Sequence, residues 1–437
     1  MTAPGLIIAA PSSGSGKTTL TLGLLRHLAR RGRRVGAAKA GPDYIDPAFH
    51  AAAGGGGCVN LDSWAMRRDT LAGLIAGLAG ELVVCEGVMG LFDGADVENG
   101  TDGSTAELAA LTGWPVVLVV DARGQGASAA ALVQGFARHR PEVRVAGVIF
   151  NRIGGEPHRR ILARACAAAC PEIKLLGFLP RDEALALPSR HLGLVQACER
   201  PDLEAFLDRA AAAVAAHVDV EALLSLAGPT VVDAAPARPV GPLGQRIAVA
   251  RDPAFAFAYG AILDGWARAG AEIIPFSPLA DEPPDPGADA VYLPGGYPEL
   301  HAGRLAAASR FLDGLRGAAI RGAAIFGECG GYMVLGKHLV DADGAVHAMA
   351  GLLDLETSFA ARRLHLGYRQ ARLLGPSPLG EGGGFRGHEF HYATILAERG
   401  AALFDTADAA GRPLGPAGLR DGKVAGSFVH VIDRTEG

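Results

Sequence analysis

The sequence predicts an α/β protein made of two units, each built on a mainly parallel β-sheet, with a phosphate-binding loop in the first unit. Short continuous apolar runs alternate with amphipathic stretches, a proline-rich stretch interrupts this alternation once, and the first apolar run leads into a glycine-rich turn. Continuous apolar strands separated by helical stretches are typical of a parallel sheet that helices bury on both faces. At ~150 residues per domain the chain is long enough for two or three domains, and we expect two.

The first series of elements extends from the N-terminus to an alanine-rich helix expected at 203–226. A further helix is expected from Thr18, directly after the glycine-rich turn. The expected strands of this series are short, apolar and rich in β-branched residues, and they lie at 6–9, 35–38, 82–85, 116–120, 145–149 and 174–177.

The second series has expected strands at 247–250, 290–293, 323–326 and 424–429. Between the two series, the stretch 228–242 contains four prolines and little periodicity, which is typical of an interdomain linker. We therefore predict a first unit at 1–227, a linker at 228–245 and a second unit at 246–437.

Composition excludes several classes of partner. The net charge of -5 and a pI near 6.2 give no basic field, which argues against nucleic acid or an anionic membrane as a partner. The six cysteines include no CxxC pair, and the first residues lack the pattern of a signal peptide, so we expect a reduced, cytoplasmic enzyme. No apolar run reaches the roughly 18 residues of a membrane span. The oligomeric state is not readable from the sequence, and a homodimer is compatible with it.

The turn after the first strand predicts nucleotide binding. Backbone amides of such a turn and of the following helix N-terminus surround phosphate oxygens, Lys17 bridges the outer phosphates, and the Thr18 hydroxyl holds Mg²⁺. Pro11 stands where the first glycine of the usual pattern lies, but strand, turn and helix follow in the required order. We expect ATP to contact Ser13, Gly14, Ser15, Gly16, Lys17, Thr18 and Thr19.

Polar residues at strand ends are candidates for binding the metal ion and the adenine base of ATP. Glu86 directly follows the strand 82–85, where a carboxylate reaches a phosphate-bound metal, and Asp43 and Asp46 stand at a similar strand exit. Asp beside Pro also forms turns, which is the structural alternative for both. Asn151 lies beyond another strand, where its amide can read adenine or simply cap a turn, and Asp121 is a weaker candidate of the same kind.

A nucleophile elbow is predicted in the second unit. Strand 323–326 leads through a turn flanked by glycines to Cys329 and a helix, and a helix N-terminus lowers a thiol pKa. The other five cysteines lie in apolar elements or plain loops and fit inert side chains. His430, at the end of the strand 425–429, is the expected base. The expected oxyanion-hole amides are those of Gly295, Gly296 and Gly330.

The segment from His388 to His391 offers a weaker metal signal. His388, Glu389 and His391 are metal-ligating types, but their spacing on an expected strand supplies no third clear ligand. Structural or pocket-lining roles are therefore the preferred interpretation.

Together these motifs resemble the cobyrinic/hydrogenobyrinic acid a,c-diamide synthases of cobalamin biosynthesis over essentially the whole chain. The resemblance rests on the segments 10–19, 39–50, 86–94, 189–194 and 295–299 and on those around Cys329 and His430. It implies a dethiobiotin-synthetase-like first domain, a class I, triad-type glutaminase as the second, and a requirement for Mg²⁺, ATP and glutamine. It also implies that the a and c acetates are amidated in turn and that the corrinoid and metal site includes Asp43, Tyr44, Asp46, His50, Glu86 and Asp93.

Two departures from the glutaminase pattern leave the third triad member unassigned. Many class I glutaminases carry Glu two positions after the histidine, and this family often has a second His there, but the chain has Ile432. Glu389 and Asp433 are the candidates for orienting His430.

Three other functions are alternatives to this one. Cobyric acid synthase and nickel-sirohydrochlorin diamide synthase are close alternatives, and the loop 41–50 favours the a,c-diamide enzymes over the former. A partitioning-type P-loop ATPase is distant, because the segment 11–13 lacks its signature lysine and a glutaminase half would be unexplained. The segments 10–16 and 388–394 most resemble enzymes that use metal-free hydrogenobyrinic acid, with the cobalt-containing acid as the alternative.

Overall fold

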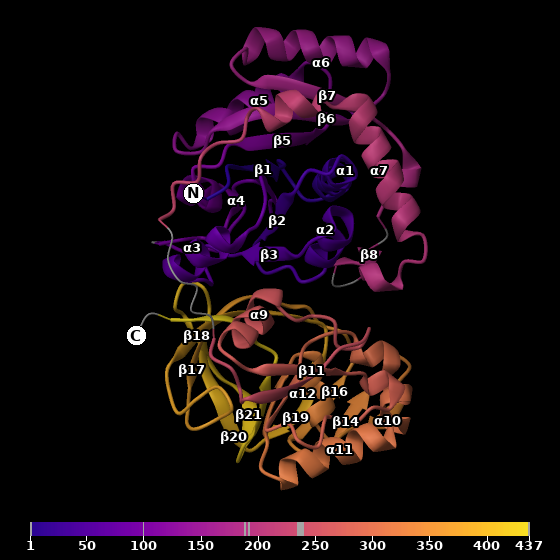
Figure 1. Ribbon diagram of the computed structural model, residues 1–437, viewed down its shortest axis with the longest axis vertical. Coiled ribbons are helices and arrows are strands. Elements are labelled where there is room, and N and C mark those ends of the chain that lie inside the picture. Colours follow the sequence, from indigo (N-terminus) through magenta and orange to yellow (C-terminus); the bar gives the residue numbers. More distant parts are fainter. Residues whose placement is uncertain (1, 99, 188, 191–192, 234–239, 436–437) are drawn as a thin grey trace. The chain divides into compact units, whose positions relative to one another are not determined.

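The computed structural model describes residues 2–98, 100–187, 189–190, 193–233 and 240–435 (Figure 1). The chain forms two compact units. The N-terminal unit comprises Met1–Trp64, Arg68–Gly94 and Asn99–Ala237, and the C-terminal unit comprises Ala65–Arg67, Ala95–Glu98 and Arg238–Gly437. The predicted linker at 228–245 stays a prediction, and its stretch 234–239 lies outside the described residues, as do His191 and Leu192 of the motif at 189–194.

The N-terminal unit is built on a seven-stranded sheet with the order β3-β2-β4-β1-β5-β6-β7. All six strand pairings are parallel, which confirms the predicted fold class of this unit. The central strand β1 is buried along its whole length because strands lie on both sides of it. The strands are β1 (Gly5–Ala9), β2 (Val35–Ala40), β3 (Cys58–Leu61), β4 (Leu82–Glu86), β5 (Val116–Asp121), β6 (Val145–Ile153) and β7 (Lys174–Pro180).

Helices connect these strands. They are α1 (Lys17–Arg30), α2 (Asp46–Gly54), α3 (Arg68–Gly77), α4 (Thr105–Thr112), α5 (Ser128–His139), α6 (Glu156–Ala169), α7 (Leu203–His217) and α8 (Val220–Leu224). α1 and α7 lie side by side (Figure 1), and a Cβ atom at Gly23 would stand 2.5 Å from the carbonyl oxygen of Ala210. Glycine at this position therefore allows the close approach of the two helices.

The C-terminal unit contains a ten-stranded sheet with the order β11-β10-β12-β13-β22-β21-β20-β17-β18-β23. The segment from β11 to β22 is parallel, and the remaining pairings are antiparallel. Its strands are β10 (Arg246–Ala250), β11 (Glu272–Phe276), β12 (Ala290–Leu293), β13 (Ala324–Glu328), β17 (His365–Leu373), β18 (Gly384–His391), β20 (Ala401–Ala407), β21 (Pro413–Asp421), β22 (Val424–Ser427) and β23 (His430–Arg434). The predicted α/β class is confirmed here too.

A second sheet of the same unit has the order β15-β14-β16-β19. Its strands are β14 (His338–Val340), β15 (Val346–Ala348), β16 (Asp354–Ser358) and β19 (Thr394–Arg399), and the helices of the unit are α9 (Gly260–Arg268), α10 (Ala302–Ala307), α11 (Ser309–Ile320) and α12 (Gly330–Leu335). Among the described residues of the chain, no helix combines the length and apolarity required to cross a membrane.

The predicted strand 424–429 is wrong at its C-terminal end. β22 ends at Ser427, whose Oγ accepts a hydrogen bond from the Val429 amide at 3.0 Å and closes a turn. His430 consequently opens the next strand, β23, where it pairs with His388 of β18.

Candidate active sites

The phosphate loop joins β1 to α1 and depends on two glycines in left-handed conformation. Gly14 has φ +77° and Gly16 has φ +97°. A Cβ atom at Gly16 would stand 2.1 Å from Asn151 Nδ2, which donates to the Ser15 carbonyl at 2.9 Å. Asn151, predicted to read adenine, thus braces the loop from the end of β6, and its contact with a base stays a prediction.

Two further loop residues differ in their surroundings. Ser13 is exposed, so a ligand can reach it from solvent. The hydroxyl of Thr19 donates to the carbonyl of Leu185 at 3.3 Å and so contacts the segment after β7.

Lys17 extends from the start of α1 across the loop that follows β4. Its Nζ donates to the Met89 carbonyl at 2.6 Å, and the side chain is buried. Burial lowers the pKa of Lys17 to about 8, although Glu86 acts in the opposite direction. The ammonium therefore lies between the phosphate loop and the predicted substrate loop.

A buried charge cluster stands at the carboxyl ends of β2 and β4. Glu86 Oε1 accepts from the Thr18 hydroxyl at 2.6 Å and from Lys39 Nζ at 3.0 Å, and Glu86 Oε2 lies 2.6 Å from His50 Nε2. Lys39 Nζ also pairs with Asp46 at 2.6 Å. Lys39 and Glu86 are direct neighbours in the register of the two strands, so the sheet itself places them together.

The two carboxylates of this cluster are shifted in opposite directions. Burial acts to raise the pKa of Glu86, but Lys39 and His50 outweigh it and hold that pKa below its usual range. Burial and the neighbouring Asp43 raise the pKa of Asp46 to about 6, against the effect of Lys39. Glu86 is therefore the firmly ionised member of the pair.

The oxygen atoms of this cluster could supply some of the ligands of a magnesium ion. Mg²⁺ prefers oxygen ligands, commonly one or two carboxylates completed by phosphate and water. Thr18 Oγ1 and Glu86 Oε1 face each other at 2.6 Å, so two of the three predicted ligands lie together. Asp46, the third, is bound to Lys39 Nζ.

Of the predicted substrate residues, Asp46 and His50 lie in α2 and belong to this cluster, whereas Asp43, Tyr44 and Asp93 lie in the loops beside it. Asp43 Oδ1 accepts from the amides of Ile45 and Asp46 at 2.7 and 3.0 Å, so it shapes the turn that starts α2. Asp93 Oδ2 accepts from the Gly90 amide at 2.8 Å in the same manner. Tyr44 is half-buried. Their contact with a substrate stays a prediction.

A cavity of about 230 Å³ adjoins the phosphate loop. Gly16, Asn151 and Arg152 form part of its wall, together with residues of the segment 179–186, which covers the end of β7 and the chain after it and was not predicted from the sequence. Asp121 is not among the lining residues and pairs with Arg152 at 2.6 Å, so a structural role explains it.

The nucleophile elbow is formed as predicted between β13 and α12. Cys329 has φ 47° and ψ −101°, a conformation that L side chains rarely adopt. A Cβ atom at Gly331 would stand 1.9 Å from the Leu293 carbonyl oxygen, so the turn needs glycine there. The amide of Cys329 donates to the carbonyl of Ser427 at 2.8 Å and fixes the elbow against β22.

The expected lowering of the thiol pKa is not found. Cys329 is 1% exposed, and burial, followed by the charge of Glu299, raises the pKa of its thiol. The helix that follows has only six residues, which is too short for a strong dipole to offset the burial. Ionisation of Cys329 therefore requires a proton acceptor at the thiol.

His430 lies beside Cys329 at the glycine-rich turn after β12. A Cβ atom at Gly295 would stand 2.4 Å from His430 Cε1, 3.1 Å from His430 Nε2 and 3.4 Å from Cys329 Cβ. The Nε2 edge of the imidazole thus faces the same small space as the cysteine. Burial, with His388 and His391 adding to it, lowers the pKa of His430 to about 3.

The three predicted oxyanion-hole glycines also adjoin that space. A Cβ atom at Gly330 would stand 3.0 Å from the Gly296 amide nitrogen, so these two residues face each other closely. Gly295 is fixed by its carbonyl, which accepts from the Phe257 amide at 2.9 Å. The role of their amides in an oxyanion hole stays a prediction.

Both candidate acids of the sequence analysis are engaged by arginines. Glu389 Oε2 accepts from Arg369 Nε at 2.6 Å, and Asp433 Oδ1 accepts from an Arg67 guanidinium nitrogen at 2.8 Å. Glu328 was not predicted from the sequence, and its Oε2 lies 3.7 Å from His430 Nδ1. A carboxylate directly before a nucleophilic cysteine was the available signal.

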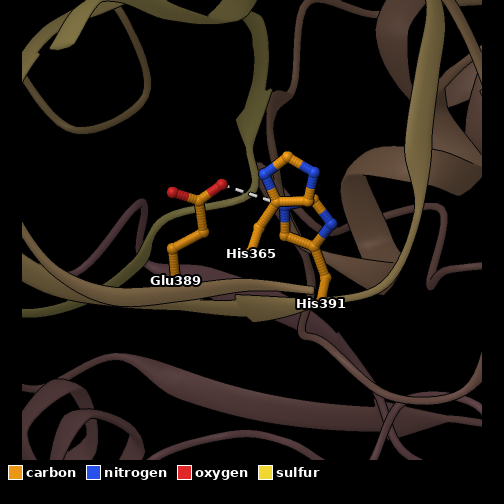
Figure 2. Close-up of side chains that lie close together, drawn as sticks. All are labelled: His365, Glu389 and His391. Carbon is orange, nitrogen blue, oxygen red and sulfur yellow. Dashed lines mark hydrogen bonds and ion pairs between the residues drawn. The ribbon is translucent and has the colours of Figure 1, made fainter. Parts of the chain in front are cut away.

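His365, Glu389 and His391 form a compact cluster, which Figure 2 shows, and their donor atoms lie within 4.8 Å of one another. His365 of β17 lies opposite His391 in the ladder and was missing from the sequence analysis. The two rings stack with centroids 4.6 Å apart and planes 4° apart, so their in-plane lone pairs run parallel and do not converge on one ion. With Arg369 on Glu389, this geometry favours the preferred interpretation of a structural or pocket-lining role over a metal site.

Comparisons with known proteins cover both units. Residues 6–195 match the CobQ/CobB/MinD/ParA nucleotide binding domain, and residues 246–436 match the CobB/CobQ-like glutamine amidotransferase domain. The chain is 57% identical over 432 residues to the hydrogenobyrinate a,c-diamide synthase of Rhodobacter capsulatus, with 98% of each chain covered. It is 56% identical over 435 residues to the proteins of that name from Brucella anthropi, with 98% of each chain covered, and from Rhizobium meliloti, with 99% of this chain and 100% of the relative covered.

Proposed function

The chain belongs to the family of hydrogenobyrinate a,c-diamide synthases, and from this membership we propose that it amidates the a and c acetate carboxylates of hydrogenobyrinic acid with ATP and glutamine. The resemblance drawn from the motifs is thereby confirmed. The observation that carries the proposal is the 57% identity over 98% of the chain, which includes the nucleotide-binding and the glutaminase unit together. Mg²⁺, held by Thr18 and Glu86, is part of the proposal.

The N-terminal unit is proposed to activate the carboxylate. A carboxylate at neutral pH is a poor electrophile, so an acetate oxygen attacks the γ-phosphorus of ATP, and the bond to the β-phosphate oxygen breaks to give an acyl phosphate and ADP. Lys17 and the loop amides stabilise the charge on the transferring group. Bound Mg²⁺ supplies further charge neutralisation on the phosphate oxygens.

The substrate loops are proposed to hold the corrinoid beside this site. Asp43, Tyr44, Asp46, His50 and Asp93 are the residues assigned to it. Lys39 and His50 fix Glu86, which keeps a negative charge at the position where it faces Thr18.

The C-terminal unit is proposed to release ammonia. Cys329 transfers its proton to His430 Nε2 and attacks the glutamine carboxamide, and the resulting oxyanion is stabilised by amides of Gly295, Gly296 and Gly330. His430 then protonates the leaving nitrogen, which departs as ammonia and leaves a thioester that water hydrolyses. Ammonia displaces phosphate from the acyl phosphate and forms the amide.

A substrate panel tests the proposal. The purified protein is given ATP, Mg²⁺ and glutamine with hydrogenobyrinic acid, cobyrinic acid, a corrinoid a,c-diamide or nickel-sirohydrochlorin, and products are followed by mass spectrometry. We expect the mass changes of one and then two amides with hydrogenobyrinic acid. Amidation of the a,c-diamide alone would indicate cobyric acid synthase activity. Amidation of nickel-sirohydrochlorin alone would indicate nickel-sirohydrochlorin diamide synthase activity.

A further inference from the structure

A buried carboxylate stands directly before the nucleophile. Glu328 is the last residue of β13 and is 2% exposed. Its Oε2 lies 3.7 Å from Nδ1 of His430. The other ring nitrogen, Nε2, adjoins Gly295, and Cβ of Cys329 adjoins the same glycine. The ring therefore has an acid on its Nδ1 side, and its Nε2 borders the space beside Gly295 that Cys329 also borders.

Two donors fix this carboxylate, one from the adjacent strand β12 and one from β23. The hydroxyl of Tyr292 in β12 donates to Glu328 Oε2 at 2.7 Å, and the amide of Val431 in β23 donates to Oε1 at 3.0 Å. Val431 directly follows His430, so one peptide segment carries both the base and a contact that positions the acid. Tyr292 is itself held by packing against Trp266 and Phe326. Glu328 is therefore a positioned group.

The other acids near His430 have different partners. Glu389 is held by Arg369 and His391, Asp433 is held by Arg67, and the position two residues after His430 is Ile432. These ion pairs neutralise Glu389 and Asp433 locally. The hydrogen-bond partners described for Glu328 are the Tyr292 hydroxyl and the Val431 amide, and neither is a cation.

We propose that Glu328 is the positioning acid of the glutaminase: its carboxylate accepts a hydrogen bond from Nδ1–H of His430, which leaves Nε2 to take the Cys329 proton. The inference rests on the proposed function and adds a residue to it. When the S–H bond breaks and the Nε2–H bond forms, the imidazolium lies between thiolate and carboxylate, and the 3.7 Å contact shortens to a charge-assisted hydrogen bond.

The burial of His430 makes this compensation necessary. Burial is the main effect that disfavours a proton on His430, His388 and His391 of β18 add to it, and Glu389 of the same strand acts in the opposite direction. Burial raises the pKa of Glu328 to about 7, so its ionised form is available at and above neutral pH. Ionised Glu328 therefore stabilises protonated His430, which is the role of the acid in a Cys/His/acid triad.

The test compares Glu328→Gln with the matched variants Glu389→Gln and Asp433→Asn in the full-length enzyme. Gln keeps the size of Glu and an acceptor for the Val431 amide, so folding is preserved. We expect Glu328→Gln to lower kcat for glutamine hydrolysis by roughly 10²- to 10⁴-fold, with KM for glutamine changed by less than about threefold. The matched variants should have clearly smaller effects on kcat.

A second measurement separates positioning from structure. The rate of Cys329 alkylation by iodoacetamide is followed from pH 5 to 10, because it reports the thiolate that proton transfer to His430 creates. Glu328→Gln should slow alkylation at pH 7 and shift its midpoint to higher pH, and Tyr292→Phe should shift it in the same direction by less. A variant with reduced folding alone would lose amplitude without a shift of midpoint.

The outcomes distinguish this inference from the function on which it rests. If the parent enzyme does not hydrolyse glutamine, the proposed function itself fails. If the parent hydrolyses glutamine and folded Glu328→Gln retains kcat within threefold and an unchanged alkylation midpoint, Glu328 is not the positioning acid. A large loss of kcat in Glu389→Gln in its place would assign the role to Glu389.

Discussion

Lys17 and Lys39 are both buried lysines near Glu86, yet their contacts predict effects of different size on stability when each is replaced. Lys39 separates two buried carboxylates, so Lys39→Met leaves like charges without their ammonium and should cost about 3–5 kcal/mol in the free energy of unfolding. Lys17 contacts a single carbonyl, so Lys17→Met should change stability by only about 1 kcal/mol.

Replacing Lys17 should also change the activity of the enzyme. Lys17→Met should lower ATP-dependent amide formation by about 10²-fold or more and leave glutamine hydrolysis in place, because the charge on the transferring phosphoryl group loses a partner. Urea unfolding and a product assay measure the two quantities. Normal amide formation in folded Lys17→Met would remove the nucleotide assignment.

His388 predicts a dependence of stability on pH. Burial lowers its pKa from the ordinary value of 6.5 to about 4. Between these values the unfolded chain binds more protons than the folded one, so this contribution to stability is lost as the pH falls. His388→Asn should therefore flatten the decline by up to about 1.4 kcal/mol per pH unit in that window.

Urea unfolding of both proteins at pH 7, 6 and 5 checks this slope. His217→Asn is the control, because His217 is exposed in the folded protein and should leave the slope unchanged. Equal slopes for the parent and His388→Asn would contradict the burial argument.

The residues that the sequence revealed least well are those whose role depends on a neighbour in space. Cys329 and Lys17 stand in local motifs, so their positions were predictable. Lys39 and Glu328 act through register and packing: Lys39 becomes an ion-pair centre because it aligns with Glu86, and Glu328 reaches His430 only after β13 and β23 are assembled. The thiol pKa of Cys329 was mispredicted because burial outweighs a short helix.

At the scale of elements, the packing of α1 on α7 depends on Gly23. A Cβ atom there would meet Ala210 O at 2.5 Å and Val214 Cγ2 at 2.7 Å, and the carbonyl cannot move without shifting α7. Gly23→Ala should therefore destabilise the N-terminal unit by about 1–3 kcal/mol despite the higher helix propensity of alanine.

Gly135 in α5 is the matched control for Gly23. It is exposed and a Cβ atom there meets nothing within 4 Å, so Gly135→Ala should stabilise by about 0.5–1 kcal/mol. Thermal or urea unfolding of the two variants gives the sign of each change. Stabilisation by both substitutions would show that α7 moves away from α1 at little cost.

Most of the parallel strands were predictable because continuous apolar runs mark them, whereas several other features were not. The short strand β3 follows a glycine tract and carries little periodicity. The antiparallel strands β17 and β20 are only partly buried, which weakens the apolar signal. The break between β22 and β23 depends on a turn that the Ser427 hydroxyl closes, and the apolar residues before and after it conceal it.

At the scale of the whole molecule, two chemistries are joined in one polypeptide. The alignment with two of the relatives covers at least 98% of this chain and therefore includes both units. In the proposed mechanism, ammonia passes from the glutaminase reaction to the amide-forming reaction. Because ammonia is small and can also be supplied from solution, the two reactions are separable by experiment.

Cys329→Ala provides that separation. Without the thiol no thioester forms, so glutamine-dependent amidation should fall by ~10³-fold or more. Amidation supplied with ammonium chloride at pH 8.5 should stay within about threefold of the parent rate, since free ammonia reacts directly with the acyl phosphate and the nucleotide site is intact. Cys198→Ala, which replaces an exposed cysteine, is the control and should retain both activities. Mass spectrometry of the corrinoid product with each nitrogen source measures the outcome. Loss of both activities in a folded Cys329→Ala protein would mean that the cysteine serves the amide-forming step as well, and the assignment of one chemistry to each unit would be wrong.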